Sequence, residues 1–403
     1  MTQKALVHDG HLIDSGILTN ILNLIIDEGG DYEISRFDVG KTPDDESHLR
    51  ILLKAQDSDS LEALADKLSV LGMRGLGETE AVWGKVTRDK AAPENFYSTT
   101  NHRTEVFYEG KWRPVARQRM DAAIVKTSSG PECVKLRDLK VDDDVLLGSS
   151  SVTVHPPVAE TGGTDGFAFM DNEVSSERNA TLAAETVASE MRDIRQRGGK
   201  IVTVAGPVVI HTGGGDALAK LVSGGWIQGF LGGNAIAVHD LESRLFGTSL
   251  GVDLTTGRPT HEGHKNHMMA INEVYSHGSI AEMIASGGLE GGLMHAVIGS
   301  GIPFCLAGSI RDDGPLPETE MDMIAAQKAY AEIIADAEMI LMLSTMLHSI
   351  GTGNMTPSWV KTVCVDINPA VVTKLSDRGS AQAVGIVSDV GLFLRALASF
   401  LDG

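Results

Sequence analysis

The C-terminal half of the chain alternates between short apolar runs and longer stretches whose apolar residues recur at helical spacing. The stretches between the runs, such as 323–335, have the pattern of amphipathic helices. Strands that alternate with helices predict a parallel sheet with helices on both faces. We therefore expect a doubly wound α/β domain over residues 166–403. Its six strands are predicted at Ile201–Ala205, Trp226–Leu231, Pro303–Ala307, Met339–Leu343, Thr362–Val365 and Ala383–Val387.

Residues 1–92 follow a different order, which reads strand, helix, strand, strand, helix, strand. The first helix is predicted near 17–28 and stops at Gly29-Gly30, and the second is predicted near 61–71. This order is that of the split βαβ arrangement and predicts a ferredoxin-like module. Residues 93–165 carry short β-like runs broken by Gly, Ser and Asp-rich turns, which predicts a small β-rich domain.

Composition limits the classes of partner. The 403 residues and the hydrophobic content of 42% allow more than one core, so a multidomain globular protein is expected. The chain has 34 Lys and Arg against 54 Asp and Glu, which gives a formal net charge of -20. This excess repels phosphate backbones and anionic lipid surfaces. We therefore expect neither nucleic acid nor a membrane as partner, whereas a cationic small molecule fits the charge.

Cysteine usage and the N-terminal residues favour a cytoplasmic protein. The three cysteines form no C-x-x-C pair, so the sequence signals neither a disulfide framework nor a zinc site. His261, His264 and His267 have no Cys or carboxylate partners at a matching spacing, and we expect no metal site. The N-terminus lacks the apolar stretch of a signal peptide. All apolar runs are shorter than the roughly 20 residues that a membrane helix needs.

Polar and small residues follow the predicted strands of the C-terminal domain. In open parallel sheets the ligand lies beyond the carboxyl ends of the strands, so these residues are the first candidates for binding. We expect them to contact a nucleotide cofactor. They are Gly206-Pro207, Gly232-Gly233-Asn234, Gly308-Ser309, Ser344-Thr345, Asp366-Ile367-Asn368 and Ser388-Asp389.

Two segments have a more specific interpretation as cofactor contacts. Gly213, Gly214 and Gly215 precede a helical stretch, where residues without Cβ let backbone N–H groups approach a phosphate, although three glycines also suit an ordinary loop. Asp366 would accept hydrogen bonds from a ribose diol and would repel a 2′-phosphate, which favours NAD over NADP. It would equally serve as the N-cap of the next helix.

Charged residues near the predicted strand ends are candidates for catalysis. The turn from Arg311 through Asp312 to Pro317 suits ligand capture, although turns favour such residues for backbone reasons alone. His239, Asp240 and Glu242 lie on the helix after Asn234, either near the cofactor or on a solvated helix face. The polar segment 348–357 could close over a ligand or be a plain connection.

Several long segments resemble the archaeal-type ornithine cyclodeaminase family, whose members are often labelled as LOR/SDH bifunctional enzymes. The resemblance covers essentially the whole chain and implies an NAD-binding domain similar to deoxyhypusine synthase. Carried onto this sequence, it implies cofactor contacts at Asn234, Ala235, Asp313, Thr345, Met346, Leu347, His348, Asp366, Asp389 and Val390. The matching segments include FDVGKTPDD (37–45), FYSTTNH (96–102), GTSLGVDL (247–254), AGSIRDDGPLP (307–317) and VDINPAVVTKLSDRGSAQAVGIVSDVG (365–391).

The resemblance also implies the redox-neutral conversion of L-ornithine to L-proline and ammonia through bound NAD, in a homo-oligomer. Such a site needs a base for the α-ammonium, an anionic partner for the δ-ammonium and a cationic or N–H partner for the carboxylate. Asp240, Glu242, Asp312 and Asp313 are the candidates for the first two, and Arg311 or Arg103 for the third.

Two other functions remain open at the level of sequence. One is a saccharopine-type amino-acid dehydrogenase that would exchange NADH with solution. The other is a non-catalytic sensor in which the ferredoxin-like module binds an amino acid and the C-terminal domain binds NAD. The density of polar residues at the strand ends favours an enzyme.

Overall fold

The computed structural model describes residues 2–10, 12, 16–40, 45, 47–75, 79–155, 176–250, 252–253, 265–312, 314–371 and 383–402. The chain divides into two compact units. The first consists of Met1–Gly166 with Asn354–Trp359, and the second of Phe167–Gly353 with Val360–Gly403. Both predicted N-terminal modules therefore lie in the first unit. The boundary drawn between them at residue 92 stays a prediction.

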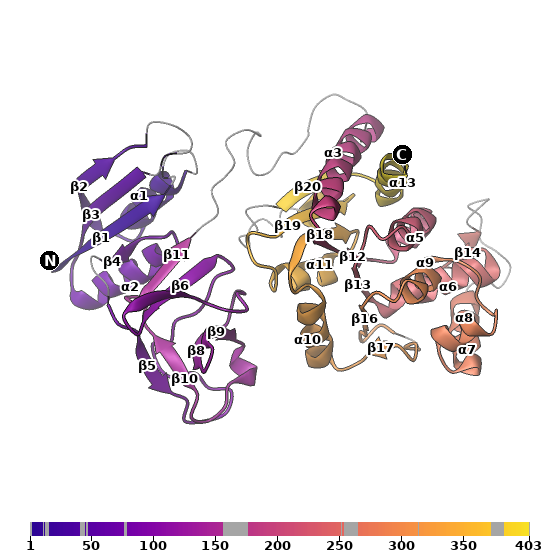
Figure 1. The fold of residues 1–403 in the computed structure, drawn as a ribbon, viewed down its shortest axis with the longest axis horizontal. Coiled ribbons are helices and arrows are strands. Elements are labelled where there is room, and N and C mark those ends of the chain that lie inside the picture. Colours follow the sequence, from indigo (N-terminus) through magenta and orange to yellow (C-terminus); the bar gives the residue numbers. More distant parts are fainter. Residues whose placement is uncertain are drawn as a thin grey trace. The chain divides into compact units, whose positions relative to one another are not determined.

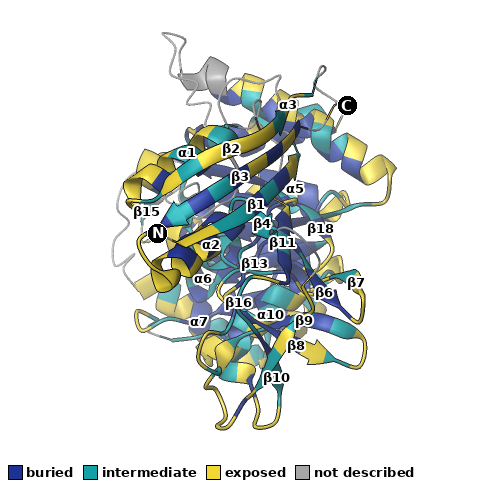
Figure 2. Cartoon of the chain, turned by 90° about the vertical axis from the view of Figure 1, so that its left-hand side faces the viewer, coloured by how far each residue is buried: buried dark blue, intermediate teal, exposed yellow. Residues whose placement is uncertain are grey.

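The start of the first unit has the predicted order of elements. Its sheet has the order β2-β3-β1-β4 with antiparallel pairs, as a split βαβ module requires. Strand β3 alternates between buried and exposed residues and directs Leu49, Ile51 and Leu53 to the core, whereas β2 is largely exposed (Figure 2). The elements are β1 (Thr2–Gly10), α1 (Ile17–Asp27), β2 (Asp31–Asp38), β3 (Ser47–Ala55), α2 (Ser58–Ser69) and β4 (Arg74–Gly75).

Two small antiparallel sheets complete the first unit, with the orders β5-β10-β8-β9 and β11-β6-β7. The segment 354–359 packs with them, because the Ser358 N–H donates to the Asn101 carbonyl over 2.9 Å and the Arg103 guanidinium lies 5.5 Å from the centre of the Trp359 ring. The strands are β5 (Val82–Lys85), β6 (Arg103–Tyr108), β7 (Lys111–Pro114), β8 (Ala123–Thr127), β9 (Gly130–Val134), β10 (Asp144–Leu147) and β11 (Val152–His155), with a 3₁₀ turn at Leu136–Asp138.

The second unit contains the predicted parallel sheet. Its order is β17-β16-β13-β12-β18-β19-β20, and all neighbouring strands are parallel. The fold class is confirmed, with two local corrections. Trp226 lies before β13, where its ring stacks under the Arg195 guanidinium, and the short edge strand β17 was not predicted. The strands are β12 (Lys200–Ala205), β13 (Gly229–Gly233), β16 (Phe304–Ala307), β17 (Thr319–Glu320), β18 (Ala337–Leu343), β19 (Lys361–Asp366) and β20 (Ala383–Val387).

The helices of the second unit form two groups. One group joins α3, α13, α5, α9, α6 and α7 through successive contacts, and the other pairs α10 with α11 (Figure 1). Their bounds are α3 (Ser176–Gln196), α4 (Val208–His211), α5 (Gly215–Ser223), α6 (Asn234–Phe246), α7 (Asn266–His277), α8 (Ile280–Ala285), α9 (Leu293–Gly299), α10 (Met323–Ile333), α11 (Met346–Gly353) and α13 (Val390–Leu401). A two-stranded ribbon, β14 (Thr248–Ser249) with β15 (Val252–Asp253), follows α6.

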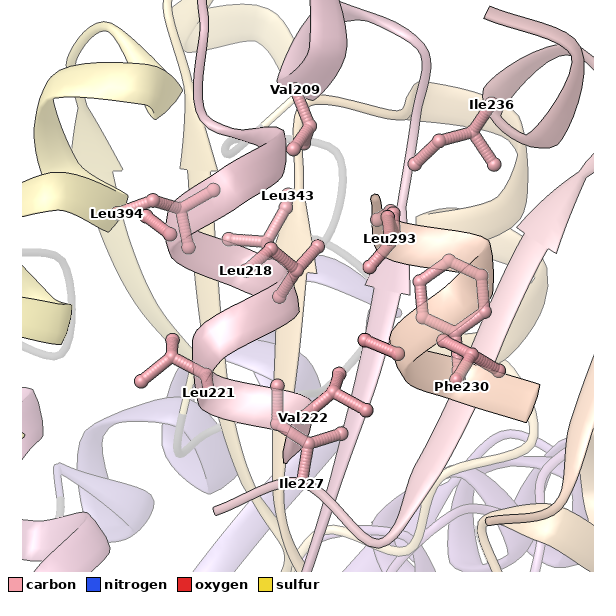
Figure 3. Close-up of a cluster of buried hydrophobic side chains, with 14 of the residues drawn as sticks. Val209, Leu218, Leu221, Val222, Ile227, Phe230, Ile236, Leu293, Leu343 and Leu394 are labelled. Atoms are coloured by element: carbon pink, nitrogen blue, oxygen red, sulfur yellow. The ribbon is translucent and has the colours of Figure 1, made fainter. Parts of the chain in front are cut away.

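A continuous apolar core lies between the sheet and the first group of helices. Figure 3 shows Leu218 of α5 and Phe230 of β13 among its buried side chains, together with Leu293 of α9 and Leu394 of α13. Since these residues come from segments far apart in the sequence, the core holds the carboxyl ends of the strands in fixed register. None of the helices in the described residues combines the length and the apolar composition of a membrane span.

Candidate cofactor and catalytic site

The order of the strands reverses between β12 and β18, because the chain places β13 and β16 on one side of β12 and β18 to β20 on the other. The segments after β12 and β18 meet here. The Gly206 N–H donates to the Leu343 carbonyl over 2.9 Å, and a Cβ added at Gly206 would lie 2.3 Å from the Ser344 oxygen. Such a reversal point opens the crevice in which doubly wound sheets bind nucleotides.

Asn234, the first residue of α6, is buried at the end of β13. Its side-chain oxygen accepts hydrogen bonds from the Leu316 N–H and the Thr319 hydroxyl, both over 2.9 Å, and its amide donates to the Gly314 carbonyl. Asn234 therefore holds the segment that follows β16 close to the end of β13. Ala235, next to it, is half-buried.

Tyr330 of α10 and His348 of α11 form a hydrogen-bonded pair beside the same strand end. The Tyr330 hydroxyl lies 2.6 Å from the Gly232 carbonyl and 3.1 Å from His348 Nδ1. The pKa of His348 is lowered by burial, an effect that the nearby Asp312 carboxylate opposes. Burial also raises the pKa of the Tyr330 hydroxyl, which therefore keeps its proton.

The turn after β16 carries Arg311 and Asp312. The Asp312 carboxylate accepts the Ser309 N–H over 2.6 Å and thereby closes the turn, while Arg311 is exposed. Ile310, which precedes Arg311, is also fully exposed. Asp313 lies outside the described residues.

Four predicted contacts lie at the ends of β19 and β20, and the three polar ones also have local roles. Asp366 Oδ1 accepts the Asn368 N–H, and Asn368 Oδ1 accepts the Ala370 N–H. Asp389 caps α13 by accepting the Leu392 N–H over 2.8 Å. The first residue of that helix, Val390, is buried. Asp366 thus uses one carboxylate oxygen in a turn, whereas Asn368, directly before the helical residues 369–371, takes the cap position that the sequence had offered for Asp366. The position of Asp366 at a strand end fits the ribose alternative.

Gly213 and Gly214 lie between α4 and α5, against α13, and Gly215 is the first residue of α5. A Cβ on Gly214 would meet Gly391 Cα and the Val209 carbonyl at 3.1 Å. The exposed Asp216 follows in the first turn of α5 and pairs with Arg244. The glycines therefore serve the packing of helices. Their contact with a phosphate stays a prediction, which the carboxylate of Asp216 does not favour.

Asp240 and Glu242 lie on different sides of α6 and are both buried. Asp240 is 1% exposed, and its two oxygens accept the Leu293 and Met294 N–H groups at the start of α9. Burial raises the pKa of Asp240, and these two hydrogen bonds partly offset the effect. The contacts of Asp240 are those of a helix cap, so they support a structural role more directly than the predicted catalytic one.

Glu242 lies in a network of buried polar groups. It accepts hydrogen bonds from the Thr248 hydroxyl and the Leu250 N–H, and one oxygen lies 3.0 Å from His239 Nδ1. The rings of His239 and His211 are 4.8 Å apart, and His211 Nδ1 is hydrogen-bonded to Ser249. Because Glu242 has no exposed surface, it would act on a ligand through a side chain that it binds, such as His239.

The structure adds Tyr330 to the predicted site residues, and it joins His239, already named with Asp240 and Glu242, to Glu242 and His211. Tyr330 occupies a position of α10 that the helical pattern assigns to the core, and His211 ends a short helix that was not predicted. Tyr330 belongs to no motif, so no signal in the sequence marks it, whereas His211 is the first residue of the glycine-rich segment 211–216. The other candidate partner of the carboxylate, Arg103, lies in the first unit.

Comparison with protein-family models finds three matches that together span nearly the whole chain. Residues 185–397 match the model described as Arginine dihydrolase ArgZ-like, C-terminal, Rossmann fold. Residues 103–184 match the first region of the same C-terminal part, and residues 3–102 match the LOR/SDH bifunctional enzyme conserved region.

Curated relatives are similar over almost the full chain. The bifunctional arginine dihydrolase/ornithine cyclodeaminase AgrE of Nostoc sp. is 48% identical over 402 residues, which cover 98% of this chain and 57% of AgrE. The ornithine cyclodeaminase of Methanocaldococcus jannaschii is 46% identical over 400 residues, with 98% of this chain and 95% of that protein covered. The chain thus spans little more than half of the cyanobacterial relative and nearly all of the archaeal one.

Solved structures give the same picture. The apo structure of ArgZ, an arginine dihydrolase from the ornithine-ammonia cycle in cyanobacteria, matches with a TM-score of 0.86 and 44% identity, covering 100% of this chain and 58% of that one. The ternary complex of AgrE with ornithine and NAD+ matches with a TM-score of 0.54 and 46% identity, covering 100% and 57%.

Proposed function

Because the chain belongs to the family of ArgZ-like C-terminal regions with a Rossmann fold, we propose that it is an ornithine cyclodeaminase that converts L-ornithine to L-proline and ammonia with bound NAD. The observation that carries this proposal is the similarity, end to end, to the archaeal relative of that name. The relative crystallised with ornithine and NAD+ supports the same substrate and cofactor.

The second unit fits NAD. Its strand order reverses between β12 and β18, where Gly206 leaves no side chain between two backbone segments. Asp366 at the end of β19 offers a carboxylate to a ribose diol, which favours NAD over NADP. We propose that Asn234, Ala235, Asp313, Thr345, Met346, Leu347, His348, Asp366, Asn368, Asp389 and Val390 line the cofactor site. When bound, NAD accepts hydride from Cα of ornithine and returns it to the cyclic imine.

The overall reaction leaves the acid and base groups of the protein unchanged. L-Ornithine carries one net positive charge at neutral pH, L-proline carries none, and the departing ammonium ion carries one. A group that takes a proton from the α-ammonium must therefore give it back within the same turnover. Side chains that alternate easily between two protonation states, above all histidines, suit this requirement.

The binding and catalytic roles are assigned to the described residues as follows. Arg311 is the partner of the substrate carboxylate, since this exposed residue lies in the turn after β16. Asp312, in the same turn, is the anionic partner of the δ-ammonium. Glu242 acts through His239. Asp240 holds the start of α9, and because both of its carboxylate oxygens accept backbone N–H groups there, it is the candidate least suited to contact the substrate.

The proposed enzyme belongs among the cytoplasmic lyases that form proline. The three buried, unpaired cysteines suit a reducing compartment. Homo-oligomer formation rests on the family resemblance alone.

Ornithine deuterated at Cα tests the proposal. The full-length protein, loaded with NAD, is expected to form proline and ammonia in equal amounts, with deuterium retained largely at Cα of proline and no accumulation of free NADH. Retention follows because the hydride leaves Cα and returns to the same carbon. The readouts are mass spectrometry of proline, an ammonia assay and absorbance at the NADH band.

Two results would contradict the proposal. NADH that accumulates in proportion to consumed substrate would indicate a dehydrogenase of the saccharopine type. Ornithine binding without any turnover would indicate the amino-acid and NAD sensor. Omission of NAD is the control, because proline formed by protein freed of NAD would exclude the proposed chemistry.

A further inference from the structure

The hydrogen bonds of Tyr330 determine which nitrogen of His348 carries a proton. The hydroxyl has a single proton, which it keeps because burial raises its pKa. The Gly232 carbonyl, 2.6 Å away, can only accept, so the hydroxyl donates to it. Towards His348 Nδ1, at 3.1 Å, the hydroxyl oxygen is then an acceptor, and Nδ1 must be the donor.

With its proton on Nδ1, the neutral imidazole has a lone pair on Nε2. The side chain of His348 is largely buried, and burial lowers its pKa, so the neutral form dominates near pH 7. In the described part of the chain, Nε2 has no hydrogen-bond partner. It is therefore available as a proton acceptor for a bound molecule.

Gly233, the last residue of β13, leaves room for Nε2 of His348. A Cβ added at Gly233 would lie 2.7 Å from Nε2, which is closer than side chains tolerate. Any other residue there would displace the imidazole. Gly233 precedes Asn234, so Nε2 faces the strand end at which NAD and substrate are proposed to bind.

The ionisable groups that act on Tyr330 and His348 come from different elements. Asp312, after β16, acts on His348 and favours its protonated form, whereas Cys305 of β16 contributes to the raised pKa of Tyr330. The imidazole can thus take up a proton beside a carboxylate that stabilises the resulting cation.

We propose that Tyr330 is a positioning residue that holds His348 as its Nδ1–H tautomer, and that His348 Nε2 takes the proton of the α-ammonium group of ornithine. This inference rests on the proposed cyclodeaminase function and assigns roles within its site.

The proton transfer is balanced within one turnover. One N–H bond of the α-ammonium breaks, its electron pair stays on the nitrogen, and an Nε2–H bond forms, which leaves His348 as a cation. The proton returns from Nε2 to the same nitrogen when this nitrogen departs as ammonia. The δ-ammonium must separately give up one proton before its nitrogen can attack, and this proton is returned to the ring nitrogen of proline within the same turnover.

The experiment combines imidazole NMR with steady-state kinetics of the full-length protein. Long-range ¹H–¹⁵N spectra of histidine-labelled protein without ligand distinguish Nδ1–H from Nε2–H, and a spectrum of His348→Gln assigns the His348 signal. Wild type is expected to show the Nδ1–H form near pH 7. In Tyr330→Phe the acceptor for Nδ1–H is lost, and the Nε2–H form is expected to appear.

For Tyr330→Phe we expect kcat for proline formation to fall roughly 10- to 100-fold with little change in KM, in line with the loss of a partner that orients a histidine. Tyr275→Phe is the matched control, since the Tyr275 hydroxyl also donates to a backbone carbonyl, that of Pro315, over 2.6 Å. It should leave the His348 spectrum unchanged and lower kcat far less.

Two outcomes overturn the inference, and neither depends on variants that fail to fold. One is an Nε2–H or doubly protonated His348 in the wild type near pH 7. The other is a Tyr330→Phe protein that loses the Nδ1–H form yet keeps the wild-type kcat. Proline formation by the wild type separates these failures from failure of the proposed function, because the spectra are recorded without substrate.

Discussion

At the level of single residues, neighbours decide what an ionisable side chain can do. Asp240 and Glu242 are the same kind of acid on the same helix, yet one caps α9 and the other holds His239. His211 is a further case, because burial, followed by the charge of His239, lowers its pKa to about 4, while Glu242 acts in the opposite direction. A histidine that resists protonation in the folded state makes stability depend on pH.

Replacement of His211 by Asn is expected to flatten this dependence. Between pH 6.5 and about 4 the unfolded chain binds a proton at His211 that the folded chain excludes, so stability falls as the pH is lowered through this window. Asn removes the titration and can still bond to Ser249. Relative to pH 7, the variant should lose about 1–2 kcal/mol less than wild type by pH 4, an amount reduced for the partial exposure of the ring. Urea unfolding at several pH values measures it, and equal slopes would contradict it.

At the level of elements, close approaches between helices set positions that tolerate no side chain. Helix α13 begins against the segment after α4, where Arg395 donates to the Thr212 carbonyl over 3.1 Å. A Cβ on Gly391 would lie 2.4 Å from the same carbonyl oxygen. Since Asp389 caps this helix, the contact also fixes one of the proposed cofactor residues.

We expect Gly391→Ala to destabilise the protein by about 1–3 kcal/mol, because the added methyl group must push α13 away from Thr212. The control is Gly299→Ala at the end of α9, where an added Cβ meets nothing within 4 Å. That variant should be neutral or more stable by about 0.5–1 kcal/mol. Thermal or chemical unfolding compares the two, and a tolerated Gly391→Ala would contradict the close packing.

At the level of the whole molecule, the two units separate the proposed cofactor site from the ferredoxin-like module. All described residues proposed to line the NAD site lie in the second unit, whereas β1 to β4 belong to the first. Binding of NAD should therefore change the hydrogen exchange of the second unit and leave that of the ferredoxin-like module unchanged.

Mass spectrometry measures this difference as the hydrogen-exchange rate of the backbone amides in each segment. NAD at a hundredfold excess over its Kd should stabilise the second unit by about 2.7 kcal/mol and slow its most protected amides roughly 100-fold. Protection is expected first in 344–353, 366–371 and 388–392, with no change in 47–75. Protection by NAD that is confined to 47–75 would place the NAD site in the first unit and contradict the proposal. Protection of 47–75 by ornithine alone would favour the sensor.

Local patterns were sufficient for the fold, because strands and helices of this length are specified by the spacing of their own apolar residues. The alternation after Gly198 predicted the doubly wound sheet, and the chemistry of the strand ends singled out Asn234, Asp366 and Asp389. Errors stayed local, as at Trp226, where stacking under Arg195 outweighs the β-like composition.

The class of fold, the family and the edge of the sheet at which a cofactor is expected were thus predictable from the amino-acid sequence. Which polar residues meet depends on tertiary packing. Tyr330, His348 and Gly232 come from α10, α11 and β13, and no spacing along the chain relates them. Burial is likewise a property of the packed molecule. It raises the pKa of Asp240, whose oxygens accept hydrogen bonds at the start of α9, and it lowers the pKa of His348, which favours the neutral imidazole.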